Sequence, residues 1–189
     1  MTDVRPYAYF RDGLVPFEEA NVSIASAPVL YGLSIYTVFP VLWDGKRHKL
    51  YMFRLQDHFR RLQNSAKIMA FDDFLQRWDY GKFESAMREL LSQNKVEESS
   101  LVRVSIFVDE SLKGTRMHGL KHSLSAFVYT TPPLLPKSGA RLMVSNWRRS
   151  SDNSIPSRAK INGSYVNLSL AAGEARENGF DEAIQLNEN

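Results

Sequence analysis

The sequence predicts an α/β (α+β) protein: an N-terminal, mainly antiparallel sheet with packed helices, followed by the beginning of a second, larger domain. Two Asp-Gly pairs, at 12–13 and 44–45, each lie between apolar runs and predict tight β-hairpins. The segment 132–139 is rich in proline and cannot pair inside a sheet, so it is expected to connect two structural units.

The first strands follow from the two hairpin signals. One hairpin is predicted to join 7–10 to 14–15. The other joins 35–42 to 50–53, with 43–45 as its turn. The first third of the chain is therefore expected to be β-structure.

Two amphipathic helices are expected next, over 55–69 and 83–93, because apolar residues recur there at helical spacing. The apolar positions are Leu55, Phe59, Leu62, Ala66 and Met69 in the first helix and Phe83, Met87, Leu90 and Leu91 in the second.

The segment 100–108 alternates between two faces and predicts a strand, and 123–131 predicts another. Val102, Val104, Ile106 and Val108 share one face of the first of these strands. Arg103 lies on the other face, and an unpaired guanidinium inside an apolar strand is costly. We therefore expect Arg103 to face solvent, to form an internal salt bridge or to bind the carboxylate of a ligand.

After the connector a strand is predicted at 140–147, a helix at 164–178 that Gly179 ends, and a strand at 182–186. Two strands and one helix cannot close a core, so the sequence is expected to be a truncated piece of a longer chain. The predicted division is 1–131 for the N-terminal small domain, 132–139 for the connector and 140–189 for an incomplete C-terminal domain. The alternative is a complete protein with a small C-terminal extension docked on the first sheet.

Composition narrows the classes of function. The N-terminus lacks the apolar core of a secretory signal and no apolar run reaches about 18 residues, so we expect a cytoplasmic protein without a membrane partner. The net charge of +3 suits an anionic ligand, but no basic block predicts nucleic-acid binding. The 4 histidines show no metal-ligand spacing, so no metal is expected.

Lys160 stands out within 154–165, SIPSRAKINGSY, because a helix begins a few residues later with Asn162 or Ser164 as its possible cap. The positive end of a helix disfavours a nearby ammonium, so a partly desolvated lysine there becomes an amine nucleophile for a carbonyl. The alternative is a solvated surface lysine, which is the commoner case.

Two further pairs of residues have two interpretations each. Arg60 and Arg61 lie on the first predicted helix, where one arginine could bind a phosphate while the other is solvated, or both could be solvated. Tyr31 and Tyr36 flank a glycine and either line a pocket or belong to the core.

The segment 145–165 resembles the active-site segment of branched-chain amino acid aminotransferases, which are class IV, fold-type IV, pyridoxal-phosphate enzymes. The helix segment 54–68, RLQDHFRRLQNSAKI, resembles the same family, as do Tyr31-Gly32, the strand 101–108 and the end of the chain. The resemblance covers nearly the whole chain and is most specific around Lys160 and in the arginine helix.

This resemblance implies a role for each candidate residue. It implies that Lys160 attaches pyridoxal 5'-phosphate and moves a proton, that Arg61 rather than Arg60 holds the cofactor phosphate, and that Tyr165 binds the ring hydroxyl. Arg103 resembles an arginine associated with the substrate carboxylate. Tyr31 and Tyr36 resemble aromatic residues of the substrate pocket, part of which the family draws from a neighbouring subunit, so a homodimer is implied.

The implied reaction is amino transfer between a branched-chain or hydrophobic amino acid and a 2-oxo acid. Thr37 and Leu101 depart from the residues common in branched-chain enzymes, on the substrate side. Aminodeoxychorismate lyase and D-amino acid aminotransferase chemistry therefore stay open, as does a non-catalytic fragment. The resemblance places the group that pairs with the cofactor ring nitrogen after Asn189, so we expect the chain alone to be inactive or nearly so.

Overall fold

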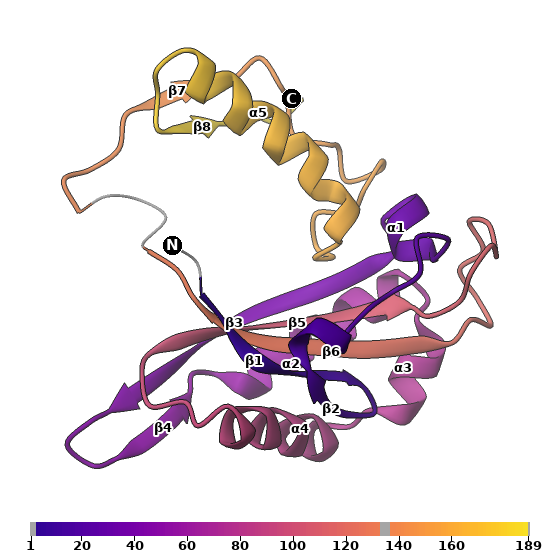
Figure 1. Ribbon diagram of the computed structural model, residues 1–189. Helices are drawn as coiled ribbons and strands as arrows, with labels where there is room; N and C mark the ends of the chain where they lie inside the picture. Colours follow the sequence, from indigo (N-terminus) through magenta and orange to yellow (C-terminus); the bar gives the residue numbers. More distant parts are fainter. Residues whose placement is uncertain (1–2, 133–136, 189) are drawn as a thin grey trace.

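The computed structural model describes residues 3–132 and 137–188, and its strands form two sheets (Figure 1). The larger sheet has six strands in the order β2-β1-β6-β5-β3-β4, and every neighbouring pair in it is antiparallel. The smaller sheet is the parallel pair β7-β8. The strands are β1 (Asp3–Arg11), β2 (Gly13–Pro16), β3 (Ser34–Asp44), β4 (Lys49–Met52), β5 (Ser100–Val108), β6 (His122–Thr130), β7 (Leu142–Val144) and β8 (Glu182–Ile184). The helices are η1 (Phe17–Glu19), α1 (Ala27–Tyr31), α2 (Leu55–Ile68), α3 (Asp72–Arg77), α4 (Tyr80–Gln93), η2 (Asn162–Ser164) and α5 (Tyr165–Glu177).

Both predicted hairpins are present, but the second turn lies later than predicted. β3 continues through Asp44, so the turn is at 45–48 and not at 43–45. The Asp44 carboxylate accepts hydrogen bonds from the backbone N–H groups of Lys46 and Arg47, at 3.1 and 3.2 Å. The aspartate therefore ends the strand and closes the turn that follows it.

The two predicted long helices are confirmed as α2 and α4. α4 begins at Tyr80, earlier than predicted, because the Asp79 carboxylate accepts from the Lys82 N–H at 2.8 Å and caps the helix there. The short helices α1 and α3 were not predicted, since 5 and 6 residues are too few to establish a helical period.

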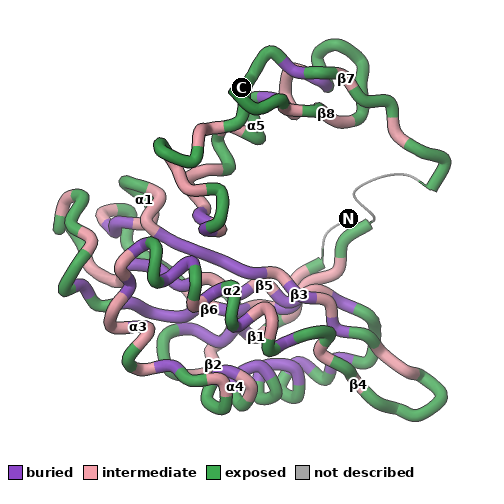
Figure 2. Tube along the Cα trace, turned by 180° about the vertical axis from the view of Figure 1, so that it is seen from behind, coloured by how far each residue is buried: buried purple, intermediate pink, exposed green. Residues whose placement is uncertain are grey.

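The core lies between the six-stranded sheet and the helices packed on one of its faces. Val102, Val104, Ile106 and Val108 are fully buried in β5, which confirms the predicted inner face. Leu101, Arg103 and Ser105 on the other face are half-buried. Figure 2 shows this burial along the central strands. The second face of β5 is thus available to build a site.

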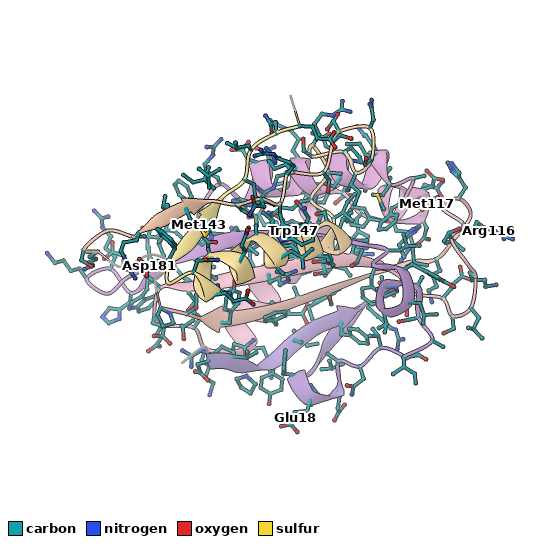
Figure 3. All side chains as sticks on the ribbon, turned by 90° about the horizontal axis from the view of Figure 1, so that it is seen from above. Glu18, Arg116, Met117, Met143, Trp147 and Asp181 are labelled. Carbon is teal, nitrogen blue, oxygen red and sulfur yellow. The ribbon has the colours of Figure 1, made fainter. Side chains whose placement is uncertain are left out.

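The C-terminal segment is a strand-helix-strand unit. β7 and β8 span only three residues each, so the predicted strands at 140–147 and 182–186 were too long. α5 ends at Glu177, and Gly179, with φ of +76°, lies just after its C-cap and stops the helix as predicted. α5 lies on the side of the large sheet opposite α4 (Figure 1) and crosses over that sheet when seen from above (Figure 3).

The structure leaves the predicted domain division untested. Half of the proline-rich connector, residues 133–136, lies outside the described residues, and the domain division stays a prediction. Within the described ranges, no helix has both the length and the apolar character required to cross a membrane.

Candidate active site

The backbone of Lys160 is fixed by two elements of the N-terminal part of the chain. Its carbonyl accepts a hydrogen bond from the Tyr36 N–H on β3, at 2.9 Å, next to an antiparallel bridge between Ile35 and Ile161. Its N–H donates to the Ser65 hydroxyl on α2, at 3.1 Å. Lys160 is therefore held at the edge of the large sheet, by residues distant from it in the sequence.

A close approach of two glycines fits the lysine loop against the turn after α1. Gly32 has φ of +67°, and a Cβ atom added to it would lie 2.9 Å from the Cα atom of Gly163. Backbone conformation and space both require glycine at position 32. The Tyr31-Gly32 and Asn162-Gly163 pairs thus meet at one point.

The Lys160 side chain meets two tyrosines. Its amine donates to the Tyr165 hydroxyl at 2.6 Å and lies 4.7 Å from the centre of the Tyr36 ring. The two tyrosine rings are 5.3 Å apart, edge to face. Lys160, Tyr36 and Tyr165 therefore form one cluster at the start of α5.

The environment separates the acidities of the two tyrosines. Burial, together with the bond to Tyr165, raises the pKa of Tyr36. Burial also acts to raise the pKa of Tyr165, but its hydrogen bonds with Lys160 and Tyr36 outweigh burial and lower that pKa. Tyr165 is thus the more acidic phenol and contacts the lysine directly.

Arg103 reaches the same cluster from the half-buried face of β5. Its guanidinium lies 4.0 Å from the centre of the Tyr36 ring and donates to the Asn162 amide oxygen at 2.6 Å. Among the described residues, Arg103 has no carboxylate partner, so the internal salt bridge is not formed. A neutral amide and an aromatic face stabilise this charge, which leaves it able to bind an anion.

Of the two predicted cap residues, Ser164 takes the N-cap position of α5 and Asn162 does not. Asn162 donates from its amide nitrogen to the Ser34 hydroxyl at 2.8 Å and accepts from Arg103, so its side chain is used in tertiary contacts. Ser164 occupies the N-cap position of α5, but its hydroxyl donates to the Ile161 carbonyl at 2.7 Å. Within the described part of the chain, no side chain caps α5 at this end.

Of the two adjacent arginines, only Arg61 faces the lysine. Arg61 lines a cavity together with Lys160 and Tyr165 and donates to the Thr37 hydroxyl at 2.7 Å. Arg60 is exposed and lies 3.7 Å from the Asp57 carboxylate. The helix therefore directs one guanidinium to the cavity and the other to solvent.

The cavity has a volume of about 340 Å³ and a cationic lining. Arg61, Arg149, Arg158 and Lys160 all line it, and no aspartate or glutamate in the described ranges does. Arg158 is the one of these four that pairs with a carboxylate among the described residues, that of Asp152 at 3.0 Å. An anionic ligand matches this lining, because a cleft with one sign of charge concentrates the opposite sign.

The structure brings together five of the six predicted site residues. Lys160, Tyr165 and Arg61 share the cavity, and Tyr36 and Arg103 contact the lysine cluster. Tyr31 lies on α1 with 45% of its surface exposed and does not line that cavity.

The sequence did not predict that Ser65, His58 and Arg149 belong to the site, nor that Asn162 accepts a hydrogen bond from Arg103. Ser65, Arg149 and Asn162 are placed by contacts between distant segments, for which the local pattern carries no signal. Helical spacing alone predicts that His58 lies beside Arg61, because residues three apart are neighbours on the surface of a helix.

An amine that donates to a phenol beside a cationic cavity matches an anionic carbonyl compound in charge and reactivity. The chain belongs to the class IV aminotransferase family, because the family model described as amino-transferase class IV matches residues 36–189. The predicted family and fold class are both confirmed.

Individual relatives agree with this assignment. A probable branched-chain-amino-acid aminotransferase from Aquifex aeolicus is 31% identical over 183 residues, which are 96% of this chain and 58% of that protein. The crystal structure of the branched-chain aminotransferase from Thermoproteus uzoniensis with norvaline superposes with a TM-score of 0.90 at 31% identity, covering 98% of this chain and 61% of that one. The crystal structure of the Escherichia coli branched-chain amino acid aminotransferase gives 0.89 at 28% identity, over 98% and 60%. The chain thus spans about 60% of the length of these relatives.

Proposed function

We propose that this chain carries the cofactor lysine of a pyridoxal-phosphate-dependent aminotransferase that acts on a branched-chain or other hydrophobic amino acid and a 2-oxo acid. The observation that carries the proposal is the Lys160 amine, 2.6 Å from the Tyr165 hydroxyl at the edge of the cationic cavity. The family membership and the names of the relatives support the same reaction.

The residues present fit this cofactor. Pyridoxal phosphate has an aldehyde, a phosphate and a ring hydroxyl, and the cavity offers an amine, guanidinium groups and a phenol. In this proposal Lys160 binds the aldehyde carbon, Arg61 holds the phosphate and Tyr165 bonds to the ring hydroxyl. When bound, the cofactor supplies an electron sink for cleavage of a bond at the carbon that bears the amino group.

The chain's own groups have distinct tasks in this proposal. The Lys160 amine would take the proton from the substrate carbon that bears the amino group and deliver it to the carbon that entered as the aldehyde. The Tyr165 phenol holds that amine by the hydrogen bond of 2.6 Å. Arg103 binds the substrate carboxylate in place of the neutral Asn162 amide, because a charged acceptor forms the stronger bond. Tyr36, whose ring lies under Arg103, forms one wall of the substrate site.

Tyr31 belongs to a surface that we propose faces a second copy of the chain. Val29, Leu30 and Tyr31 on α1 are 53, 45 and 45% exposed, although all three are apolar or aromatic. In a homodimer, Tyr31 would line the substrate pocket next to residues of the partner. We also propose a cytoplasmic location, because the N-terminus lacks the apolar core of a secretory signal. We propose that the proline-rich segment 132–139 connects the two domains.

The test is a single conversion of cofactor in the presence of L-leucine. Amino transfer converts leucine and pyridoxal phosphate into 4-methyl-2-oxopentanoate and pyridoxamine phosphate in a 1:1 ratio, and mass spectrometry measures both. Although sustained turnover by the chain alone is expected to be slow or absent, a single conversion requires only the lysine and bound cofactor, so we expect more of both products than with the Lys160→Ala variant or with free cofactor. Equal yields in all three samples would contradict the proposal.

The same incubation with aminodeoxychorismate tests the alternative lyase activity. Lyase chemistry releases pyruvate and leaves the cofactor unchanged, so pyruvate without pyridoxamine phosphate would favour the lyase.

A further inference from the structure

Three side chains form a closed triangle of hydrogen bonds behind the cavity. Arg61 donates to the Thr37 hydroxyl oxygen at 2.7 Å. That hydroxyl lies 3.0 Å from Nδ1 of His58, and Nδ1 is in turn 3.3 Å from the Arg61 guanidinium. Thr37 is fully buried on β3, while Arg61 and His58 are three residues apart on α2. The triangle thus joins the sheet to the helix that carries Arg61.

The direction of each bond follows from the chemistry of the guanidinium. A guanidinium has only donors, so the Thr37 oxygen accepts and its own proton is free to point at His58. In that orientation Nδ1 of His58 accepts a hydrogen bond from the hydroxyl and lies next to a second donor, the Arg61 guanidinium. The contact with Arg61 is a hydrogen bond only when Nδ1 carries no proton, and we assign the ring proton to Nε2 on that ground, which makes His58 neutral.

We propose that Thr37 and His58 are positioning residues that hold the Arg61 guanidinium toward the cavity, and that anion binding there requires neutral His58. This inference rests on the proposed function, in which Arg61 binds the cofactor phosphate. It identifies the pair of residues that sets the strength and the pH range of that contact.

The surroundings of His58 favour its neutral form. Burial lowers the pKa of His58, the charges of Arg61 and Arg54 lower it further, and Asp57 opposes them. Arg61 and Asp57 are on α2, and Arg54 is the residue that precedes its first turn. From β3, the ring faces Thr37 and Phe39, whose ring centre is 5.8 Å away, and neither residue is charged.

Protonation of His58 would break the triangle. A proton on Nδ1 would turn it into a donor that faces the Arg61 donor, which ends the Arg61–His58 bond, while the Thr37 hydroxyl can rotate and accept from both groups. It would also put a positive charge next to Arg61, where like charges repel. Arg61 would then lose its fixed direction, and the cavity would bind phosphate more weakly at acidic pH.

Capture at Lys160 of two aldehydes that differ only in the phosphate provides the test. The chain is titrated with pyridoxal phosphate or with pyridoxal and reduced with borohydride, and the label on the Lys160 peptide is measured by mass spectrometry. The ratio of the two apparent affinities reports the contribution of the phosphate contact, because the chemistry at Lys160 is common to both. Absence of selective capture of either aldehyde by the native sequence would overturn the proposed function, and this inference with it.

Matched substitutions separate positioning from simple packing. Thr37→Val and His58→Phe remove the hydrogen bonds and keep similar shapes, and we expect each to lower the affinity ratio about tenfold. Thr37→Ser and His58→Asn keep a hydroxyl and an acceptor, respectively, and are expected to retain most of the ratio. An unchanged ratio in Thr37→Val and His58→Phe would overturn the inference.

A pH series compares the native sequence with His58→Asn, whose side chain does not titrate. The phosphate itself loses charge below a pKa of about 6, so both proteins lose affinity in acid. The native protein is expected to lose several-fold more between pH 7 and pH 5, because only it gains a charge beside Arg61. Superimposable pH profiles would contradict the role of His58 even if one of the apolar variants failed to fold.

Discussion

Arg103 and Asn162 are joined by a hydrogen bond of 2.6 Å that links the centre of the large sheet to the loop carrying Lys160. Asn162 continues this link to Ser34 on β3 through its amide nitrogen. Together with the backbone bonds of Lys160 to Tyr36 and Ser65, this link ties the lysine to the N-terminal sheet. The position of Lys160 therefore depends mainly on elements that precede it by many residues.

Replacement of Asn162 by alanine should weaken this link. The change removes both hydrogen bonds and leaves the half-buried Arg103 without its amide acceptor, so we expect the free energy of unfolding to fall by about 1–3 kcal/mol. Urea denaturation measures the change. Asn64→Ala, at an exposed position of α2, is the control and should stay within about 0.5 kcal/mol of the native value.

Alanine at position 32 should displace the lysine loop. Gly32 has positive φ, and a Cβ atom there would lie 2.9 Å from the Cα atom of Gly163. We expect Gly32→Ala to destabilise the fold by more than about 1 kcal/mol through backbone strain alone. Thermal unfolding checks this, with Gly173→Ala as the control. Gly173 is helical with open space around it, so alanine there should stabilise by about 0.5–1 kcal/mol, and equal effects at both glycines would contradict the account.

A spectroscopic titration should find one unusually acidic tyrosine. The pKa of Tyr165 is lowered by its bonds to Lys160 and Tyr36, against the effect of burial. Difference absorbance near 295 nm should show a phenol that ionises below the usual value of about 10. Tyr165→Phe should abolish this transition and Tyr36→Phe should move it to higher pH. A native protein whose tyrosines all titrate at or above the usual value would disagree with the site geometry.

His122 should make the fold sensitive to acid. Its ring is buried, neither ring nitrogen has a hydrogen-bond partner in the described residues, and burial lowers its pKa. As the pH falls below about 6.5, the unfolded chain takes up a proton before the folded chain does, so the free energy of unfolding decreases. His122→Leu should reduce this loss between pH 7 and pH 5. A loss in His122→Leu equal to that of the native protein would rule out His122 as its source.

Strong local patterns carried most of the fold prediction. The alternation over 100–108 gave the right strand and the right faces, since burial of one face imposes a period of two. The five residues of α1 and the Asp44 turn were missed or misplaced because side-chain hydrogen bonds and tertiary packing decide such short segments. Asparagine is a common N-cap residue, but the side-chain amide of Asn162 is bonded to Arg103 and Ser34 and does not cap the helix.

The site was predictable only in part, for the same reason. Lys160, Arg61 and Tyr165 belong to two contiguous segments whose resemblance to the family is specific, and the structure places all three around one cavity. Thr37 and His58 meet across two elements, and only the folded chain shows that both contact Arg61.

The central claim is that the fold presents Lys160 as the amine that binds the cofactor. The most direct measurement adds pyridoxal phosphate to the chain, reduces with borohydride and maps the labelled peptide by mass spectrometry. We predict selective labelling of Lys160, within the peptide that contains SIPSRAKINGSY, and its loss in Lys160→Ala. Labelling spread over many lysines, or none, would contradict the claim that this chain forms a cofactor site.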